Sequence, residues 1–180
     1  GLKDFHIRNV DGSDVSLTAI PQADFYPILY VQPMKENRGL LGIDLMAEPR
    51  YRTLLETARD TGHLMVSGPV QLDFTAGDSM GDGVLFARAI YRKGADLGSL
   101  AGRRESLEGF VLQLFRIDDL IHEALRESAV LGVNISVVYG EKPDVQDSVS
   151  RPFNVARSAG KLQLRVPLDH LGKPWSLMFT

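Results

Sequence analysis

The sequence predicts an α+β fold in which two mainly antiparallel sheets are joined by a helix. Three observations support this class. Short runs of apolar or alternating residues, bounded by turn residues, are typical of strands and fill most of the chain. Residues 49–61 and 117–128 instead carry apolar side chains at helical spacing. Beyond about residue 130, strand and turn patterns alone remain.

The N-terminal segment is predicted to consist of strands. Residues 5–10 and 15–20 are short strand candidates joined by an Asp-Gly-Ser-Asp turn. Residues 25–32 are almost continuously apolar, which predicts a strand buried on both faces. Pro33 ends this strand, a polar loop follows it, and residues 40–46 form the next strand candidate.

The first helix has the clearest local signals. Pro49 opens it, because a proline in the first turn gives up no helical hydrogen bond. Gly62 follows its last turn, in the position where glycine commonly ends a helix. The apolar stripe along one face is made of Tyr51, Leu54, Leu55 and Ala58.

Strands are expected to alternate with loops after this helix. Residues 63–74 form a long strand candidate broken at Gly68-Pro69, and a loop follows at 75–83. In the next strand, residues 84–92, side chains alternate between two faces, so that Ala87 and Arg88 point to opposite sides. The remaining expected elements are a glycine-rich loop at 93–105, a strand at 107–115, the second helix at 117–128, and strands at 133–140, 153–160, 161–168 and 174–180.

Composition excludes several classes of protein and site. The net charge is −3, with acidic and basic residues well mixed, which argues against a nucleic-acid partner. The chain has no cysteine, so disulfides, zinc thiolate sites and cysteine nucleophiles are excluded. No apolar run of about 18 residues is present, and no signal peptide is visible. Because both ends look cut, we expect the chain to be a fragment of a longer protein.

No catalytic site is predicted. The four histidines are scattered, and the sequence holds no zinc-protease motif, nucleophile elbow or phosphate-binding loop. Ser67 precedes a turn, but no base and acid are placed to activate it. We therefore expect neither an enzyme nor a bound cofactor or metal. Calcium at Asp73, Asp78 and Asp82 is an alternative, although their spacing does not match an EF-hand and a solvated loop is the simpler interpretation.

Two polar residues, Arg88 and Gln113, interrupt otherwise apolar strand candidates. An enclosed Arg88 would bind a carboxylate or another anion through its guanidinium group. Small-molecule pockets typically combine apolar walls with a few polar groups of this kind. The alternative is that Arg88 simply faces solvent.

An ordered set of motifs resembles the CHASE domain, the extracytoplasmic sensory module of bacterial and plant transmembrane receptors. The motifs are, in order, DFHIRN, YPILYVQP, Asn37, LGIDL, TARDTG, SGPVQL, AIY and EGFVLQLFRIDDL. The resemblance is strongest over residues 22–120. It implies an N-terminal stalk helix, which is absent from this sequence, and two PAS-like subdomains. The membrane-distal subdomain would span residues 1–129, with the connecting helix at 117–128, and the membrane-proximal one residues 130–180.

The resemblance also implies a ligand site in the distal subdomain, where plant members bind cytokinins. This chain has Tyr51 where the family has an aspartate that contacts the purine, and Ser67 and Ala87 where it has two pocket threonines. Asp73 falls at the position of a backbone contact. Because the contacts at 51 and 87 are lost, we do not expect cytokinin binding. The full set of candidate ligand-binding residues is Tyr51, Ser67, Asp73, Ala87, Arg88, Phe110 and Gln113.

The expected function is therefore that of a periplasmic, extracytoplasmic small-molecule sensor in an inner-membrane receptor. The resemblance implies flanking transmembrane helices, a homodimer in the intact receptor, and an output domain of the histidine kinase (two-component) or diguanylate cyclase type. One alternative is a dimerisation or protein-interaction module whose pocket is filled by Tyr51, Phe86 and Phe110. A small hydrolase built on Ser67 is the least favoured alternative.

Overall fold

The structure is a computed structural model that describes residues 5–9, 25–71, 82–126, 133–141, 148–150, 163–168 and 174–180. The chain divides into two compact units, each made of several separate stretches. The first unit takes Gly1–Leu64, Asp73–Ser79 and Ala87–Val111. The second unit takes Met65–Leu72, Met80–Phe86 and Leu112–Thr180.

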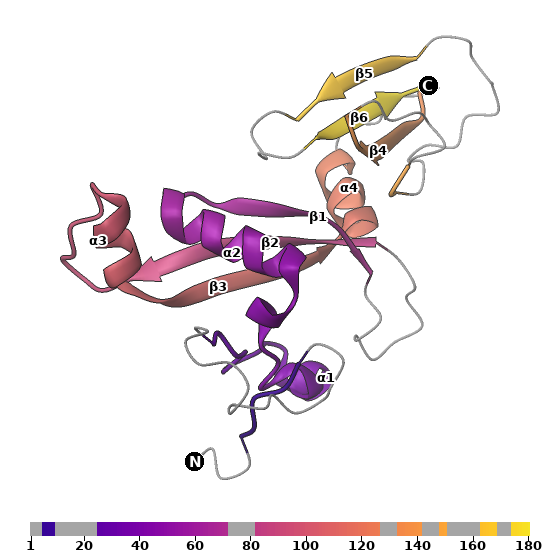
Figure 1. Ribbon diagram of the computed structural model, residues 1–180. Coiled ribbons are helices and arrows are strands. Elements are labelled where there is room, and N and C mark those ends of the chain that lie inside the picture. Colours follow the sequence, from indigo (N-terminus) through magenta and orange to yellow (C-terminus); the bar gives the residue numbers. More distant parts are fainter. Residues whose placement is uncertain are drawn as a thin grey trace. The chain divides into compact units, whose positions relative to one another are not determined.

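Helices and antiparallel sheets are both present, which confirms the predicted α+β class (Figure 1). The helices are α1 (Met34–Asn37), α2 (Pro49–Thr61), α3 (Leu100–Glu105) and α4 (Ile117–Leu125), with 3₁₀ turns η1 (Arg38–Leu40) and η2 (Leu45–Ala47). The described strands form two sheets. One has the order β1-β2-β3, from Met65–Gln71, Asp82–Tyr91 and Leu107–Arg116. The other has the order β4-β6-β5, from Ile135–Tyr139, Trp175–Phe179 and Leu164–Pro167.

The predicted strand at residues 25–32 is wrong. Its apolar side chains are not enclosed, since Leu29 is 63% exposed and Tyr30 71% exposed. The segment joins residues 40–46 through an isolated bridge between Pro27 and Asp44 and through a few backbone hydrogen bonds. Pro27 has no N–H to donate, which interrupts a regular ladder. The strand predicted at 40–46 is also wrong, because η1 and η2 occupy its two ends and only isolated bridges at Ile43 and Asp44 lie between them.

The N-terminal segment is held by contacts with the backbone around Gly42. The Arg8 amide donates to the Gly42 carbonyl at 2.8 Å. Gly42 has φ +84°, and a Cβ on it would lie 2.1 Å from the carbonyl oxygen of His6, so the position requires glycine. The buried Asp44 carboxylate accepts from the amides of Tyr26 (2.9 Å) and Met46 (3.1 Å), which caps η2.

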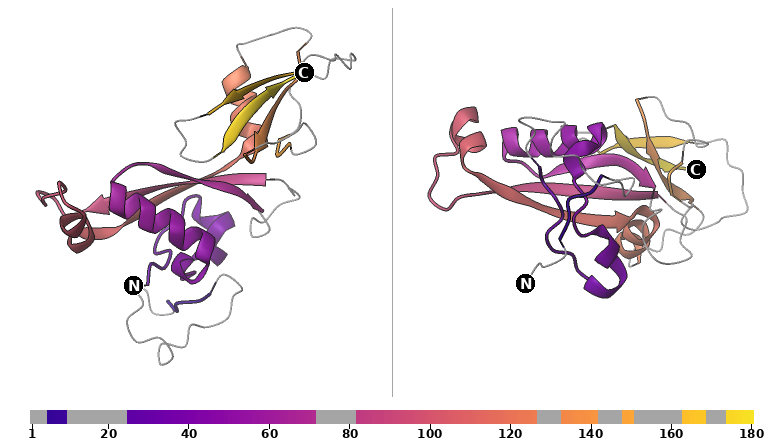
Figure 2. Two further views of the ribbon diagram at one scale, coloured as in Figure 1. Left: turned by 45° about the horizontal axis from the view of Figure 1, so that its top comes forward. Right: turned by 60° about the horizontal axis from the view of Figure 1, so that its bottom comes forward.

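Helix α2 matches its prediction closely. It begins at Pro49, and Gly62 follows its end with φ +70°, donating its amide to the carbonyl of Ala58 at 2.9 Å. All members of the predicted apolar stripe are buried: Tyr51, Leu54, Leu55 and Ala58. In both views of Figure 2, α2 runs alongside the parts of β2 and β3 that belong to the first unit.

Two other predictions need correction. Strand β1 continues through Gly68 and Pro69 instead of breaking there. It lies at the edge of its sheet, where a proline without an N–H is tolerated. The loop predicted at 93–105 contains α3, whose N-terminus is capped by the Ser99 hydroxyl, which accepts from the Gly102 amide at 3.0 Å.

The second unit has its own apolar core. The core residues come from strands β1, β2, β4 and β6 and from the start of α4, and they are Val66, Val84, Ile117, Val137 and Trp175. Rings at its margin pack edge to face, Phe86 on Phe115 with centroids 5.4 Å apart.

Several predictions fall outside the described residues: the strands at 15–20 and 153–160, the loop at 75–81 and the boundary between residues 129 and 130. The helix predicted at 117–128 is described through its first nine residues, as α4. None of the helices in the described ranges has the length and apolar character needed to cross a bilayer.

Candidate functional site

The candidate ligand-binding residues are distributed over both units. Tyr51 on α2, Ala87 and Arg88 on β2, and Phe110 on β3 belong to the first unit. Ser67 on β1 and Gln113 on β3 belong to the second unit. Asp73 lies outside the described residues. The first unit therefore holds four of the six candidate residues that the structure describes.

Tyr51 lies in the first turns of α2 and is only 3% exposed. Burial raises the pKa of its phenol above the usual value, so the ring remains neutral at physiological pH. The guanidinium of Arg50 lies 5.0 Å from the ring centroid, in cation–π geometry. Tyr51 is thus a neutral, buried ring on the first unit's helix α2.

Ala87 and Arg88 face opposite sides of β2. Ala87 is fully buried, whereas Arg88 is exposed, and the flanking residues Leu85 and Ala89 are buried like Ala87. This alternation leaves no bulge between Ala87 and Arg88. Gln113 is exposed on β3 as well. The enclosed face that an anion-binding Arg88 requires is therefore not formed by the described residues.

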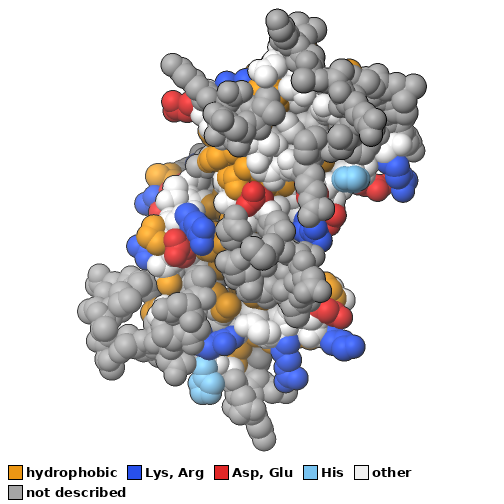
Figure 3. Space-filling model, turned by 90° about the vertical axis from the view of Figure 1, so that its right-hand side faces the viewer, with side chains coloured by type: hydrophobic (Ala, Val, Ile, Leu, Met, Phe, Trp, Pro, Cys, Tyr) orange, Lys and Arg blue, Asp and Glu red, His pale blue; other side chains and the backbone are white. Residues whose placement is uncertain are grey.

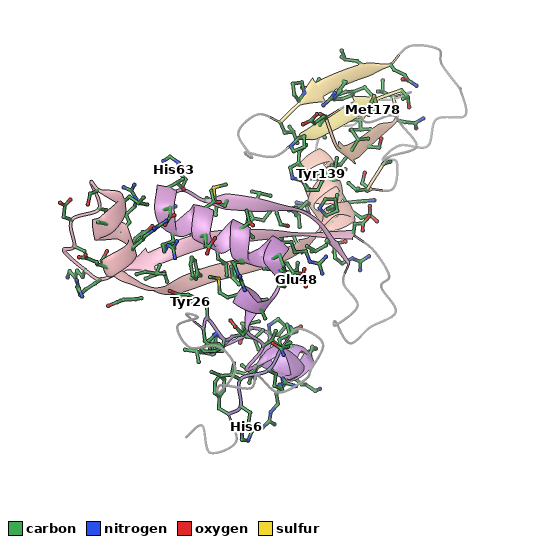
Figure 4. The ribbon with its side chains drawn as sticks, viewed as in Figure 1. His6, Tyr26, Glu48, His63, Tyr139 and Met178 are labelled. Carbon is green, nitrogen blue, oxygen red and sulfur yellow. The ribbon has the colours of Figure 1, made fainter. Side chains whose placement is uncertain are left out.

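Phe110 packs against Tyr26, a contact that the sequence patterns did not predict. The two rings meet edge to face, with centroids 5.2 Å apart and planes at 75°. Figure 4 labels Tyr26 where it reaches towards β3 from the N-terminal segment. The amide of the same residue is held by Asp44, so that one residue ties the N-terminal segment to the sheet.

The Ser67 side chain is engaged within the second unit. Its hydroxyl donates to the Gly68 carbonyl at 2.5 Å and accepts from the Leu85 amide at 3.0 Å. Its carbonyl accepts from the indole N–H of Trp175 at 3.1 Å. Because the hydroxyl proton goes to a carbonyl and not to a base, Ser67 is not arranged as a nucleophile.

Side chains from β2 and α3 satisfy the last carbonyls of α2. The Tyr91 hydroxyl donates to the Arg59 carbonyl, and the Arg103 Nε donates to the Asp60 carbonyl at 2.6 Å. The Asp60 carboxylate also pairs with Arg104, at 2.5 Å and 3.0 Å. Hydrogen bonds from Arg104 and then from Arg59 hold the pKa of Asp60 well below its usual range. The TARDTG motif contains Arg59 and Asp60, but the sequence did not predict their contacts with Tyr91, Arg103 and Arg104.

The calcium alternative stays a prediction, because Asp73 and Asp78 lie outside the described residues. Asp82, at the start of β2, has a pKa raised by burial and by the nearby Asp118. Within the ranges that the structure describes, no three His, Cys, Asp or Glu side chains are placed to hold a metal ion. On the face drawn in Figure 3, acidic and basic side chains are interspersed among apolar ones.

Comparison with known proteins identifies the family. The family profile of the CHASE domain matches residues 1–149, most of the chain. No curated protein matches the sequence. CHASE domains are extracellular, non-catalytic sensory domains of membrane receptors. The chain therefore belongs to the CHASE domain family.

Proposed function

We propose that this CHASE domain senses a small molecule in the first unit, beside the buried face of α2, and passes the signal to an enzymatic output domain of a transmembrane receptor. The observation that carries the proposal is the family match over residues 1–149. An output domain of the histidine kinase or diguanylate cyclase type, a periplasmic location in an inner-membrane receptor, and a homodimer are parts of the same proposal. So are two PAS-like subdomains that meet near residue 130.

The proposed contacts are Tyr51, Ala87 and Phe110. Together they supply two aromatic rings and a small residue, which suits a flat, largely apolar ligand. The family resemblance also implies Ser67 and Asp73, but Ser67 belongs to the second unit and is not part of this first-unit site. A cytokinin is not the proposed ligand, because Tyr51 offers no carboxylate to the purine and Ala87 offers no hydroxyl.

A thermal-shift panel on the purified domain tests the proposal, with aromatic acids, adenine derivatives and amino acids as separate groups. A ligand at 100 times its Kd stabilises a protein by about 2.7 kcal/mol. For a chain of this size, that corresponds to a rise in Tm of about 5–11 °C. If no compound class raises the Tm, small-molecule sensing by this chain loses its support.

Matched substitutions on β2 then locate the site. Ala87→Val enlarges a side chain on the buried face of β2, while Arg88→Ala shortens a side chain on its exposed face, one residue away. We expect the ligand-induced shift, measured against each variant's own ligand-free Tm, to disappear in Ala87→Val and persist in Arg88→Ala. The reverse result would move the site to the exposed face of β2 that carries Arg88.

A second candidate function is a dimerisation or protein-interaction module with a vestigial pocket. The near-complete burial of Tyr51 favours it, because a ring already enclosed by protein leaves less room for a ligand. Sedimentation equilibrium distinguishes the two. A stable dimer in a chain that no compound stabilises would support the module, whereas a ligand-stabilised monomer would exclude it.

A further inference from the structure

A compact junction between β1 and β6 lies inside the second unit. Four residues build it, from strands that are far apart in the sequence: Ser67, Gly68, Tyr139 and Trp175. Ser67 belongs to the predicted ligand-binding set, while β6 is the middle strand of the other sheet. The junction therefore joins a candidate sensing position to a different structural element.

The first contact is a buried hydrogen bond. Trp175 is 3% exposed, and its indole N–H donates to the Ser67 carbonyl at 3.1 Å across 108 residues of sequence. An indole N–H can only donate, and a buried one requires an acceptor. The bond fixes the position of the Ser67 peptide against β6 because each group satisfies the other.

The second contact depends on the absence of a side chain at Gly68. A Cβ at this position would lie 2.9 Å from the Tyr139 hydroxyl oxygen and 3.0 Å from Cζ. Glycine thus lets the Tyr139 ring approach the β1 backbone directly. Tyr139 in turn packs edge to face on Trp175, with centroids 4.8 Å apart (labelled in Figure 4).

Trp175 and Tyr139 are also paired partners in the sheet. They lie opposite each other in the antiparallel ladder of β4 and β6, whose register runs from Tyr139↔Trp175 to Ile135↔Phe179. Strand β5 pairs with the other edge of β6. A shift of these two rings therefore acts on the central strand of a sheet, and buried packing transmits such shifts instead of absorbing them.

We propose that Trp175 and Tyr139 are positioning residues that read the conformation of the Ser67–Gly68 backbone and transmit its displacement to β6. The significance for signalling rests on the proposed function, because it requires that ligand binding displaces the Ser67 backbone. The coupling itself is a property of the ligand-free domain. The contact point of this coupling is the indole hydrogen bond between β6 and β1.

The sequence provides an internal reporter, because Trp175 is its only tryptophan. A nitrogen-labelled domain therefore gives a single indole N–H signal in a two-dimensional NMR spectrum. The perturbing variant is Gly68→Ala, which introduces a methyl group against Tyr139. The matched control is Gly39→Ala, since a Cβ at Gly39 meets nothing within 4 Å.

We expect Gly68→Ala to shift the indole signal and to speed hydrogen exchange of the indole and of the β6 amides by about tenfold. Gly39→Ala should leave both unchanged. Adding Tyr139→Leu to Gly68→Ala removes the ring that the methyl group strikes and should restore slow exchange in β6. In a Trp175→Phe background, adding Gly68→Ala should accelerate hydrogen exchange of the β6 amides about tenfold less than it does in wild type.

Two outcomes would overturn the proposal. One is a Gly68→Ala spectrum whose indole signal matches that of Gly39→Ala. The other is accelerated exchange in β6 that persists unchanged with Tyr139→Leu or Trp175→Phe, because the disturbance would then travel by another route. None of these measurements uses a ligand, so their failure would leave the thermal-shift test of the proposed function untouched.

Discussion

Removing the hydroxyl group of Tyr91 tests how the end of α2 is held. In Tyr91→Phe, the Arg59 carbonyl loses its side-chain donor, whereas the Ala58 carbonyl keeps the Gly62 amide at 2.9 Å. One partly buried acceptor is thus left without this partner. Tyr91→Phe removes the net stabilisation of one hydrogen bond and leaves a carbonyl partly unsatisfied. Together these effects should lower the free energy of unfolding by about 1–2 kcal/mol.

The loss is measurable by urea unfolding, where the midpoint should fall while the slope stays constant. In a chain of this size, it corresponds to a fall in Tm of about 2–8 °C. Hydrogen exchange should accelerate most in the last turn of α2, because that turn loses its anchor. The control is Tyr30→Phe, the same chemical change at a side chain that is 71% exposed.

The same variant has a predictable pH dependence. Burial raises the pKa of Tyr91 above its usual value, so the folded state favours the neutral phenol that donates the bond. The contribution of Tyr91 is therefore complete below the unfolded pKa of about 10 and is lost as pH rises through the folded pKa. The difference between wild type and Tyr91→Phe should shrink in alkaline solution. A Tyr91→Phe variant as stable as Tyr30→Phe would refute the capping role.

Three further substitutions test other parts of the fold. The depressed pKa of Asp60 means that its contribution is complete above about pH 4 and is lost as pH falls further, so acid unfolding curves of Asp60→Asn should be flatter than those of wild type. Gly42→Ala places a methyl group 2.1 Å from the His6 carbonyl at a positive φ and should cost roughly 2 kcal/mol or more in urea, while Gly39→Ala should cost less than about 0.5 kcal/mol. Leu55→Ala, at a side chain that is 1% exposed, should lower the unfolding free energy by about 2–5 kcal/mol, and a smaller calorimetric loss would mean that the stripe is loosely packed.

The sequence correctly predicted those elements that depend on residues close together in the chain. Pro49 and Gly62 set the ends of α2 through backbone preferences of single residues, and the structure agrees at both ends. The alternation in β2 likewise gave the buried side of Ala87 and the exposed side of Arg88. These features require no knowledge of distant residues.

Other features depend on distant partners and were missed or predicted wrongly. Helix α3 is short and glycine-containing, and its Arg103 and Arg104 bond to Asp60, more than forty residues earlier. The apolar run at 25–32 resembled a buried strand, but apolar content alone does not say what covers it. For the candidate site, the contact of Phe110 with Tyr26 arises only from the tertiary arrangement.

The two compact units interleave along the chain, which limits where the domain can be divided in a chimeric protein. Neither unit is a continuous stretch, because the chain enters and leaves each of them more than once. No single crossover point in the gene separates one unit intact from the other. Chimeric receptors that exchange this sensor should therefore keep their function when residues 1–149 and the strands beyond them are transplanted as one cassette, and lose it when the junction falls inside.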